Sequence, residues 1–139
     1  MAQCHHSKLQ TVLVVEDEAL VRLELADYLA ELGFAVLQAD SADEAIALLD
    51  ADPQIAILLT DIRMAGSMDG IRLAHHVRNR WPPVKIIVAS GMVGTQFSDL
   101  PPGSIFVSKP YRPADIQSAV SYLIGRPRPV RPPPAALHA

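Results

Sequence analysis

Short apolar runs alternate with longer stretches of helical periodicity along most of this chain. Each run is too short for a helix and ends in polar or charged residues, as do strands of a parallel sheet that is buried on both faces. The longer stretches repeat apolar residues at intervals of three and four, which predicts amphipathic helices. We therefore expect five strands, over residues 11–15, 35–39, 55–59, 84–89 and 105–107.

Helices are predicted where this periodicity coincides with start and stop signals. The first covers 19–32, and the second follows a Ser-x-x-Glu capping box at 41–44. The third runs to Trp81, ahead of two prolines, and the last begins near Pro113 and ends at Gly125. Strands that alternate with helices imply right-handed crossovers, so we expect an α/β fold with a doubly wound, five-stranded parallel sheet.

One segment within the predicted domain breaks the alternation. Residues 90–104 contain three glycines and a Pro-Pro pair, so the helix expected between the last two strands should be short or missing. Outside the domain, which we place at 9–125, residues 1–8 are expected to be disordered. Residues 126–139 contain five prolines and three arginines and should form an extended tail.

Composition narrows the class of protein further. Half of the residues are hydrophobic, and the formal charge of −3 becomes −6 for residues 1–125, where nine basic residues face fifteen acidic ones. This balance argues against DNA as the main partner. Cys4 is the sole cysteine, and no apolar run reaches the ~20 residues that span a bilayer. We expect a cytoplasmic protein with neither a disulfide nor a membrane insertion.

The candidate chemistry lies where the predicted strands end. Five polar residues follow or close four of the strands, namely Glu16, Asp17, Asp61, Ser90 and Lys109. In open parallel sheets the functional crevice lies beyond the carboxyl ends of the strands, so these side chains should share one rim. Three carboxylates at close range require a cation, and hard oxygen ligands suit Mg²⁺ or Mn²⁺. A lysine and a hydroxyl beside that cation would serve a phosphoryl group.

With these residues in place, the sequence resembles the receiver domain of two-component response regulators, of the stand-alone, single-domain type. The resemblance covers about residues 9–125 and is carried by the strings VLVVEDE, LLTDIRM, IIVASG and FVSKPY. Asp61 lies 44 positions after Asp17. Each string alone is weak evidence, but their order on successive strand ends is specific.

The resemblance implies a role for each of these residues. Asp61 would be the phospho-acceptor, with a sensor histidine kinase or a histidine phosphotransfer protein as the donor. Asp17, Asp61 and the backbone carbonyl of Arg63 would hold Mg²⁺, with Mn²⁺ as a substitute, and Glu16 would assist through a metal-bound water. Ser90 and Lys109 would contact phosphoryl oxygens. Ser90 and Phe106 would form the conformational switch.

The sequence departs from the common family pattern just past Asp61. The segment DIRMAGSMDG has Ala65 where the family usually has proline, and it is one residue longer than in common members. Arg63 and Met92 flank the expected path of water to the acyl phosphate, so their bulk should slow its hydrolysis. Without a normal helix between the last two strands, the output surface should be atypical.

Other interpretations remain open at this level. Taken singly, Glu16 and Asp17 could cap the following helix, Ser90 could serve a turn, Lys109 could be a solvated loop residue, and Phe106 could be an ordinary core aromatic. The chain could be a phosphorylation-independent interaction module. An Asp-nucleophile, Mg²⁺-dependent phosphohydrolase resembling haloacid dehalogenases is disfavoured, because those enzymes have a second Asp at the position of Arg63.

We expect the receiver itself to be the output, since no effector module follows residue 125. It could bind a target protein, act as a phosphate sink or pass the group onward, as a monomer or a phosphorylation-dependent homodimer. It should assist its own phosphorylation and dephosphorylation without being an enzyme otherwise. The adjacent histidine pairs at 5–6 and 75–76 are expected to be neither metal ligands nor relay residues. The tail could dock to an aromatic-lined groove or be a linker remnant.

Overall fold

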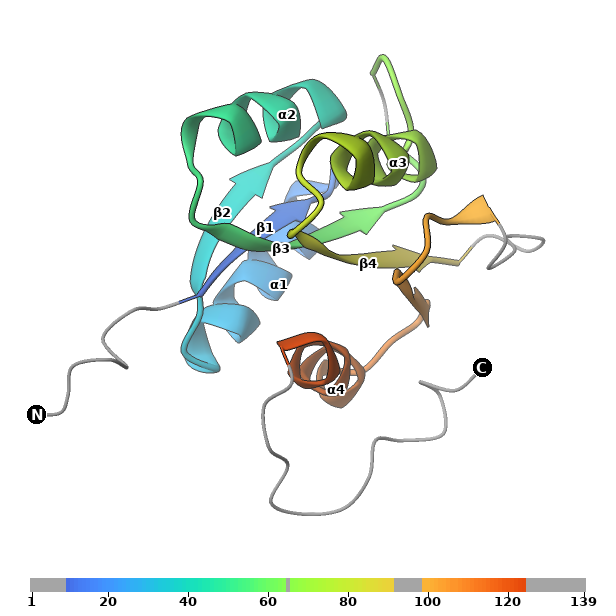
Figure 1. The fold of residues 1–139 in the computed structure, drawn as a ribbon. Helices are drawn as coiled ribbons and strands as arrows, with labels where there is room; N and C mark the ends of the chain where they lie inside the picture. Colours follow the sequence, from blue (N-terminus) through green and yellow to red (C-terminus); the bar gives the residue numbers. More distant parts are fainter. Residues whose placement is uncertain (1–9, 65, 92–98, 125–139) are drawn as a thin grey trace, which may run out of the picture.

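The computed structural model describes residues 10–64, 66–91 and 99–124. Strands and helices alternate along the chain (Figure 1). The expectations for residues 1–8 and 126–139 lie outside the described residues. The elements are, in order, β1 (Thr11–Val15), α1 (Ala19–Glu31), β2 (Ala35–Ala39), α2 (Ala42–Ala51), β3 (Ile55–Asp61), α3 (Gly70–Arg80), β4 (Lys85–Ser90), β5 (Ile105–Ser108) and α4 (Pro113–Ile124).

All five strands form one parallel sheet in the order β2-β1-β3-β4-β5. The chain first moves outward from β1 to β2 and then crosses to β3 on the other side of β1. Figure 1 shows α2 and α3 on one face of the sheet and α1 and α4 on the other. The predicted doubly wound α/β fold is therefore confirmed, and its topological switch point lies between β1 and β3.

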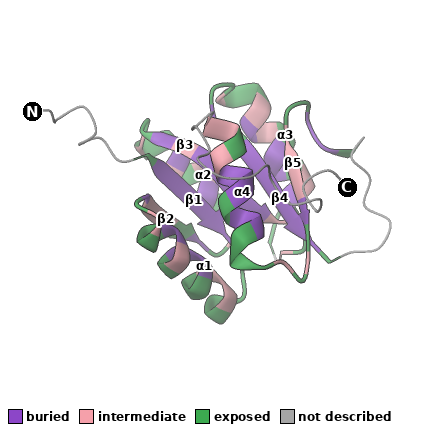
Figure 2. Ribbon diagram, turned by 90° about the horizontal axis from the view of Figure 1, so that it is seen from below, coloured by how far each residue is buried: buried purple, intermediate pink, exposed green. Residues whose placement is uncertain are grey.

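The sheet separates two apolar cores. Side chains alternate between the faces of a strand, so Leu13 and Val15 pack towards α2 and α3, while Val12 and Val14 pack towards α1 and α4. Every residue of β1 is buried, as is most of β3 and β4 (Figure 2). This explains why the central strands read as continuous apolar runs in the sequence.

The helix ends follow local capping chemistry. The Ser41 hydroxyl accepts a hydrogen bond from the Glu44 N–H at 3.2 Å, while the Glu44 carboxylate accepts one from the Asp40 N–H at 2.8 Å. Helix α1 ends just before Gly33, whose φ of +102° is the left-handed conformation that glycine adopts most readily. Helix α1 ends at residue 31 and α3 at residue 80, so each stops one residue before its predicted end.

The segment between β4 and β5 was predicted to have a short or missing helix. Its described part, residues 91 and 99–104, contains no α-helix. Residues 92–98 lie outside the described residues. The helix labelled α4 follows β5 and is the last helix predicted from the sequence. Among the residues that the structure describes, no helix is long and apolar enough to cross a membrane.

Candidate functional site

Four strand ends bring the predicted site residues to one edge of the sheet. Glu16 and Asp17 follow β1, Asp61 closes β3, and Ser90 closes β4. Lys109 comes directly after β5, and its N–H donates to the Ser90 carbonyl at 3.0 Å. Because all strands are parallel, their carboxyl ends meet at this rim, next to the switch point of the sheet.

The three carboxylates of the rim form a compact oxygen cluster. Glu16, Asp17 and Asp61 each offer one oxygen atom, and these atoms lie within 4.8 Å of one another. Glu16 is only 3 % exposed, whereas Asp17 faces solvent. The cluster therefore extends from a buried floor to an open side from which a ligand can enter.

Glu16 is held in the floor by its own local contacts. Its Oε2 accepts a hydrogen bond from the Glu18 N–H at 3.1 Å, and its backbone carbonyl accepts one from the Arg22 guanidinium at 2.8 Å. Burial raises the pKa of Glu16, and the nearby charge of Asp61 raises it further, while the Glu18 N–H and Lys109 lower it in part. The buried carboxylate is thus incompletely compensated by the protein alone.

Lys109 links two members of the cluster. Its Nζ lies 3.4 Å from Glu16 Oε1 and 3.4 Å from Asp61 Oδ2. The lysine side chain is 28 % exposed, so its ammonium is partly withdrawn from water and its attraction to the carboxylates is less screened than at an open surface. The Lys109-Pro110 peptide bond is cis.

Asp61 presents its two oxygens differently. Oδ1 accepts a hydrogen bond from the Ile62 N–H at 2.9 Å, while Oδ2 faces Lys109. The side chain is 11 % exposed and lies at the end of a largely apolar, buried strand. Such a position is costly for a carboxylate unless charge and hydrogen bonds compensate it, which is what the surrounding donors do.

Gly70 packs closely against the backbone of Asp61 and Ile62 and was not identified from the sequence. The first turn of α3 lies directly against the end of β3, and the Gly70 N–H donates to the Ile62 carbonyl at 2.8 Å. A Cβ atom at Gly70 would lie 2.0 Å from the Asp61 carbonyl oxygen and 2.8 Å from the Ile62 Cα. The signal available in the sequence was a glycine between the segment after Asp61 and the third predicted helix, but its close approach to β3 was not predictable.

Ser90 and Phe106 share one face of the sheet. Phe106 is paired in register with Val88, and Ser90 follows Val88 by two residues, so all three side chains point to the α3 side. Ser90 is buried and Phe106 is half-buried. The two side chains therefore lie on the same face of neighbouring strands.

Arg63 is the remaining residue of the predicted metal site. Arg63 is exposed in the loop after β3, and Met92, Cys4 and the histidines at 5–6 lie outside the described residues. His75 Nε2 lies 2.8 Å from the Asp99 carbonyl oxygen, and His76 packs edge-on against Trp81 with ring centroids 5.9 Å apart. Both histidines of α3 therefore make contacts outside the carboxylate cluster.

Tyr111 is a second rim residue that the sequence did not single out. Burial raises its pKa to about 12, and the carboxylates of Glu16, Asp61 and Glu24 contribute to the shift. The only sign of it in the sequence was its position, two residues after Lys109. The neutral phenol is therefore strongly favoured in the folded protein.

This pKa predicts a stability change at high pH. The folded pKa exceeds the ordinary value of 10, so the contribution of Tyr111 is fully present below pH 10 and is lost as pH rises from 10 towards 12. We expect Tyr111→Phe to lose less stability than the wild type over this window, measured by urea unfolding at a series of pH values. Tyr122→Phe is the control, because Tyr122 is 65 % exposed. Identical pH profiles for wild type and Tyr111→Phe would contradict the assignment.

The donor set fits a hard divalent cation. Three carboxylate oxygens lie within 4.8 Å of one another, Lys109 contacts two of these carboxylates, and Glu16 is buried with a raised pKa. All of the offered ligand atoms are oxygens, the preference of Mg²⁺ and Mn²⁺. A cation at this rim would reduce the repulsion among the three carboxylates.

Comparison with known proteins gives a consistent result. The family model described as "Response regulator receiver domain" matches residues 12–121. The chain is 43 % identical over 89 residues to the hydrogenase transcriptional regulatory protein HoxA of Cupriavidus necator, covering 64 % of this chain and 18 % of HoxA. It is 30 % identical over 117 residues to the transcriptional regulatory protein ResD of Bacillus subtilis, covering 83 % of this chain and 48 % of ResD.

A similar solved structure is that of a response regulator receiver protein from Sinorhizobium medicae. The two superpose with a TM-score of 0.80 and 31 % sequence identity, over 86 % of this chain and 98 % of that one. The chain spans less than half of the length of HoxA and of ResD. The likeness to those two proteins therefore concerns one of their parts.

Proposed function

The chain belongs to the response regulator receiver domain family, and we propose that it is a phosphorylation-controlled switch in which Asp61 accepts a phosphoryl group. The donor is the phosphohistidine of a sensor histidine kinase or of a histidine phosphotransfer protein. The observation that carries this proposal is the position of the Asp61 carboxylate at the rim: Oδ2 lies 3.4 Å from Lys109 Nζ, and one Asp61 oxygen belongs to the oxygen cluster. Receiver domains are regulatory and generally not enzymes.

The transfer requires a nucleophile and charge neutralisation. An oxygen of Asp61 forms the new bond to phosphorus while the bond from phosphorus to the histidine nitrogen breaks, and the imidazole keeps that electron pair and takes up a proton. We assign the attack to Oδ2, because Oδ1 is engaged by the Ile62 N–H. Lys109 lies where it can move from the carboxylates to a phosphoryl oxygen.

A divalent cation completes this site. Asp17, Asp61 and the backbone carbonyl of Arg63 would hold Mg²⁺ or Mn²⁺, with Glu16 assisting through a bound water. When bound, the cation supplies the largest positive charge near the transferring phosphoryl group. The protein thereby assists its own phosphorylation, and the same groups would assist the later hydrolysis.

The signal then passes from Asp61 to the neighbouring strands. Phosphorylation adds roughly −1.5 to −2 charges and three acceptor oxygens, which attract the Ser90 hydroxyl and Lys109. Phe106 shares the sheet face of Ser90, so a shift of Ser90 opens or closes space for the aromatic ring. Moving the population from 1:99 to 99:1 requires a preference of about 5.5 kcal/mol for the active state. The reader would be a downstream protein or a second copy of the chain.

Transfer of a labelled phosphoryl group tests the proposal directly. The full chain is mixed with a histidine kinase carrying ³²P-phosphohistidine, with Mg²⁺ or with excess EDTA. We expect label on the chain only with Mg²⁺, and its release by hydroxylamine, which cleaves acyl phosphates. An interaction module would take up no label, and a phosphohydrolase would release phosphate from monoesters continuously; either result would overturn the proposal.

Cation binding has a separate, phosphorylation-independent signature. Mg²⁺ binds the folded chain, so at a concentration 100 times its Kd it should raise the free energy of unfolding by about 2.7 kcal/mol. We expect Asp17→Asn to lose most of this gain, as measured by thermal unfolding with MgCl₂ against NaCl of equal ionic strength. Asp27→Asn, an exposed aspartate on α1, is the matched control and should retain the gain. Equal gains in both variants would place the cation elsewhere.

A further inference from the structure

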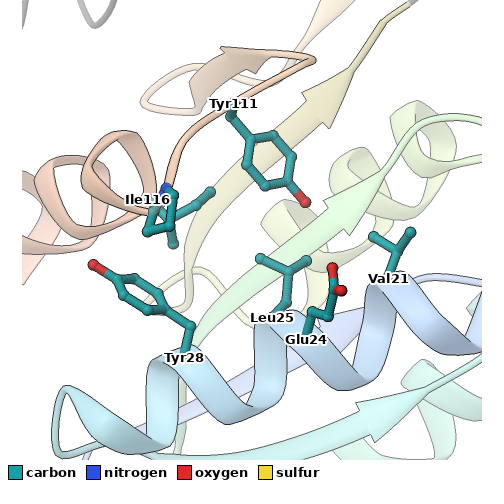
Figure 3. A pocket seen from close by; sticks show the side chains of 7 residues that line it. Val21, Glu24, Leu25, Tyr28, Tyr111 and Ile116 are labelled. Atoms are coloured by element: carbon teal, nitrogen blue, oxygen red, sulfur yellow. The ribbon is translucent and has the colours of Figure 1, made fainter.

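A groove between α1 and α4 lies next to the phosphorylation site and is not used by the proposed chemistry. Figure 3 shows Val21, Leu25 and Tyr28 of α1 facing Tyr111 and Ile116 across a cavity of about 160 Å³. A second hollow shares Val21, Glu24 and Tyr111 with this cavity and reaches Lys109. Together they form a continuous groove with an apolar wall, a tyrosine from each side and two carboxylates, Glu18 and Glu24.

The outer edge of the groove is acidic. Glu24, Asp27 and Glu31 are exposed and are spaced by three and four residues, so they lie along one side of α1. Within the described part of the chain none of the three has an ion-pair partner, and the basic residue of this helix, Arg22, is bonded to Glu16 and Gln38. The groove therefore fits an occupant that combines apolar, ring-packing surface with positive charge.

The chain itself carries a segment of this chemistry. Residues 126–139 contain three arginines, five prolines and no acidic residue. Proline-rich segments bind aromatic-lined grooves, because their backbone loses little conformational freedom on binding. Arg126, Arg128 and Arg131 are the groups that could match the acidic edge of α1.

The segment is long enough to reach the groove. It begins two residues after Ile124, the end of α4, and the eight-residue step from Ile116, which lines the groove, to Ile124 corresponds to roughly 12 Å of helix. Fourteen residues in an extended, polyproline-like conformation span up to about 43 Å. In a polyproline-like conformation Arg126 and Arg131 are about 16 Å apart. This is enough to cover the roughly 10 Å between Glu31 and Glu24 along helix α1.

A third hollow, near the end of α4, differs from the groove in charge. It has a volume of about 350 Å³ and is lined by Gln10, Lys85 and Ile124 among others. It is nearer to the start of the segment, but its charged group is a lysine, which repels arginine. Charge complementarity therefore favours the groove between α1 and α4.

We propose that residues 126–139 bind in the groove between α1 and α4 of the same chain, with their arginines paired to Glu24, Asp27 and Glu31. This inference goes beyond the proposed function and does not depend on phosphorylation. Bound there, the segment contacts Tyr111, which lines the groove.

Paramagnetic broadening in the full chain tests the proposal. A nitroxide is attached to Ala135→Cys in a Cys4→Ser background, and amide signals of the ¹⁵N-labelled protein are compared before and after reduction of the nitroxide. We expect selective intensity loss for residues 21–28 and Tyr111, with Gln10 and Lys85 unaffected. Raising the salt from about 0.1 M to about 1 M shortens the Debye length from ~10 Å to ~3 Å and should restore the lost signals.

Charge-reversal variants provide the controls. Reversing Arg126, Arg128 and Arg131 to Glu should abolish the broadening, and adding Glu24→Arg with Glu31→Arg should rescue it, whereas Lys85→Glu should leave the wild-type pattern unchanged. Three results within one chain would overturn the proposal: no broadening of α1, broadening at Gln10 and Lys85 instead, or broadening that the arginine reversal does not change. A fourth would be broadening of ¹⁵N-labelled chains without nitroxide when they are mixed with nitroxide-carrying chains that lack ¹⁵N. The last result would identify a second copy as the occupant.

Discussion

Replacing Asp61 by asparagine is expected to abolish phosphoryl transfer while the fold persists. An amide oxygen is a much weaker nucleophile than a carboxylate, and the resulting group could not form the acyl phosphate. The substitution also removes one of three carboxylates that lie within 4.8 Å of one another, so relief of repulsion offsets the lost contact with Lys109. We therefore expect the free energy of unfolding without Mg²⁺ to change by less than about 1 kcal/mol.

Asp69→Asn is the matched control for this experiment. Asp69 is another aspartate of the segment after β3, and its carboxylate caps α3 by accepting a hydrogen bond from the Arg72 N–H at 2.9 Å. Asparagine caps helices about as well as aspartate, so this variant should fold normally and accept label as the wild type does. Labelling is measured with the kinase and Mg²⁺, and circular dichroism verifies the fold. Undiminished labelling of Asp61→Asn would place the acceptor elsewhere.

Gly70→Ala is expected to disrupt both the fold and the acceptor site. The added Cβ would lie 2.0 Å from the Asp61 carbonyl oxygen and 2.8 Å from two further backbone atoms, none of which can move without displacing β3. Alanine normally favours a helix by up to about 1 kcal/mol over glycine, so propensity alone predicts stabilisation. Because backbone overlap outweighs propensity here, we expect a loss of about 3 kcal/mol, at the upper end for overpacking.

Urea unfolding followed by the fluorescence of Trp81, the sole tryptophan, measures this loss as a lower midpoint. Gly91→Ala is the control, because its added Cβ would make only an ordinary contact, 3.5 Å from Lys109 Cβ. We expect Gly91→Ala to change the free energy of unfolding little. We expect Gly70→Ala to accept label more slowly than the wild type even under conditions in which it is fully folded. A stability gain in Gly70→Ala would show that α3 moves freely relative to Asp61.

The sequence predicted the architecture because its strands are buried on both faces. Runs such as residues 11–15 have no polar face that could be mistaken for a loop or an amphipathic helix. The ends of the strands were less predictable where backbone pairing continues beyond the apolar residues. Thr60 and Asp61 pair with Val88 and Ala89, so β3 extends two residues beyond its last leucine. Conversely, Val84 looked like strand, but its N–H completes a turn to Trp81.

The candidate site was predictable to the extent that topology alone determines it. Strand ends of a parallel sheet meet, so the approach of Asp61 to Lys109 followed from their positions after β3 and β5. Contacts that depend on exact distances could not be inferred. The overlap that forbids a side chain at Gly70, the reach of Arg22 to the Glu16 carbonyl and the shared environment of Tyr111 each require coordinates.

The sheet divides the interior into two sets of packed side chains that have no member in common among the described residues. Substitutions that are well separated and share no partners change stability nearly additively. Repacking the helix pair on one face of the sheet should therefore leave the opposite face undisturbed, while both faces still border the edge of the sheet that carries the candidate site. This layout lets partner preference and signal output diverge in evolution, or be redesigned, one side at a time.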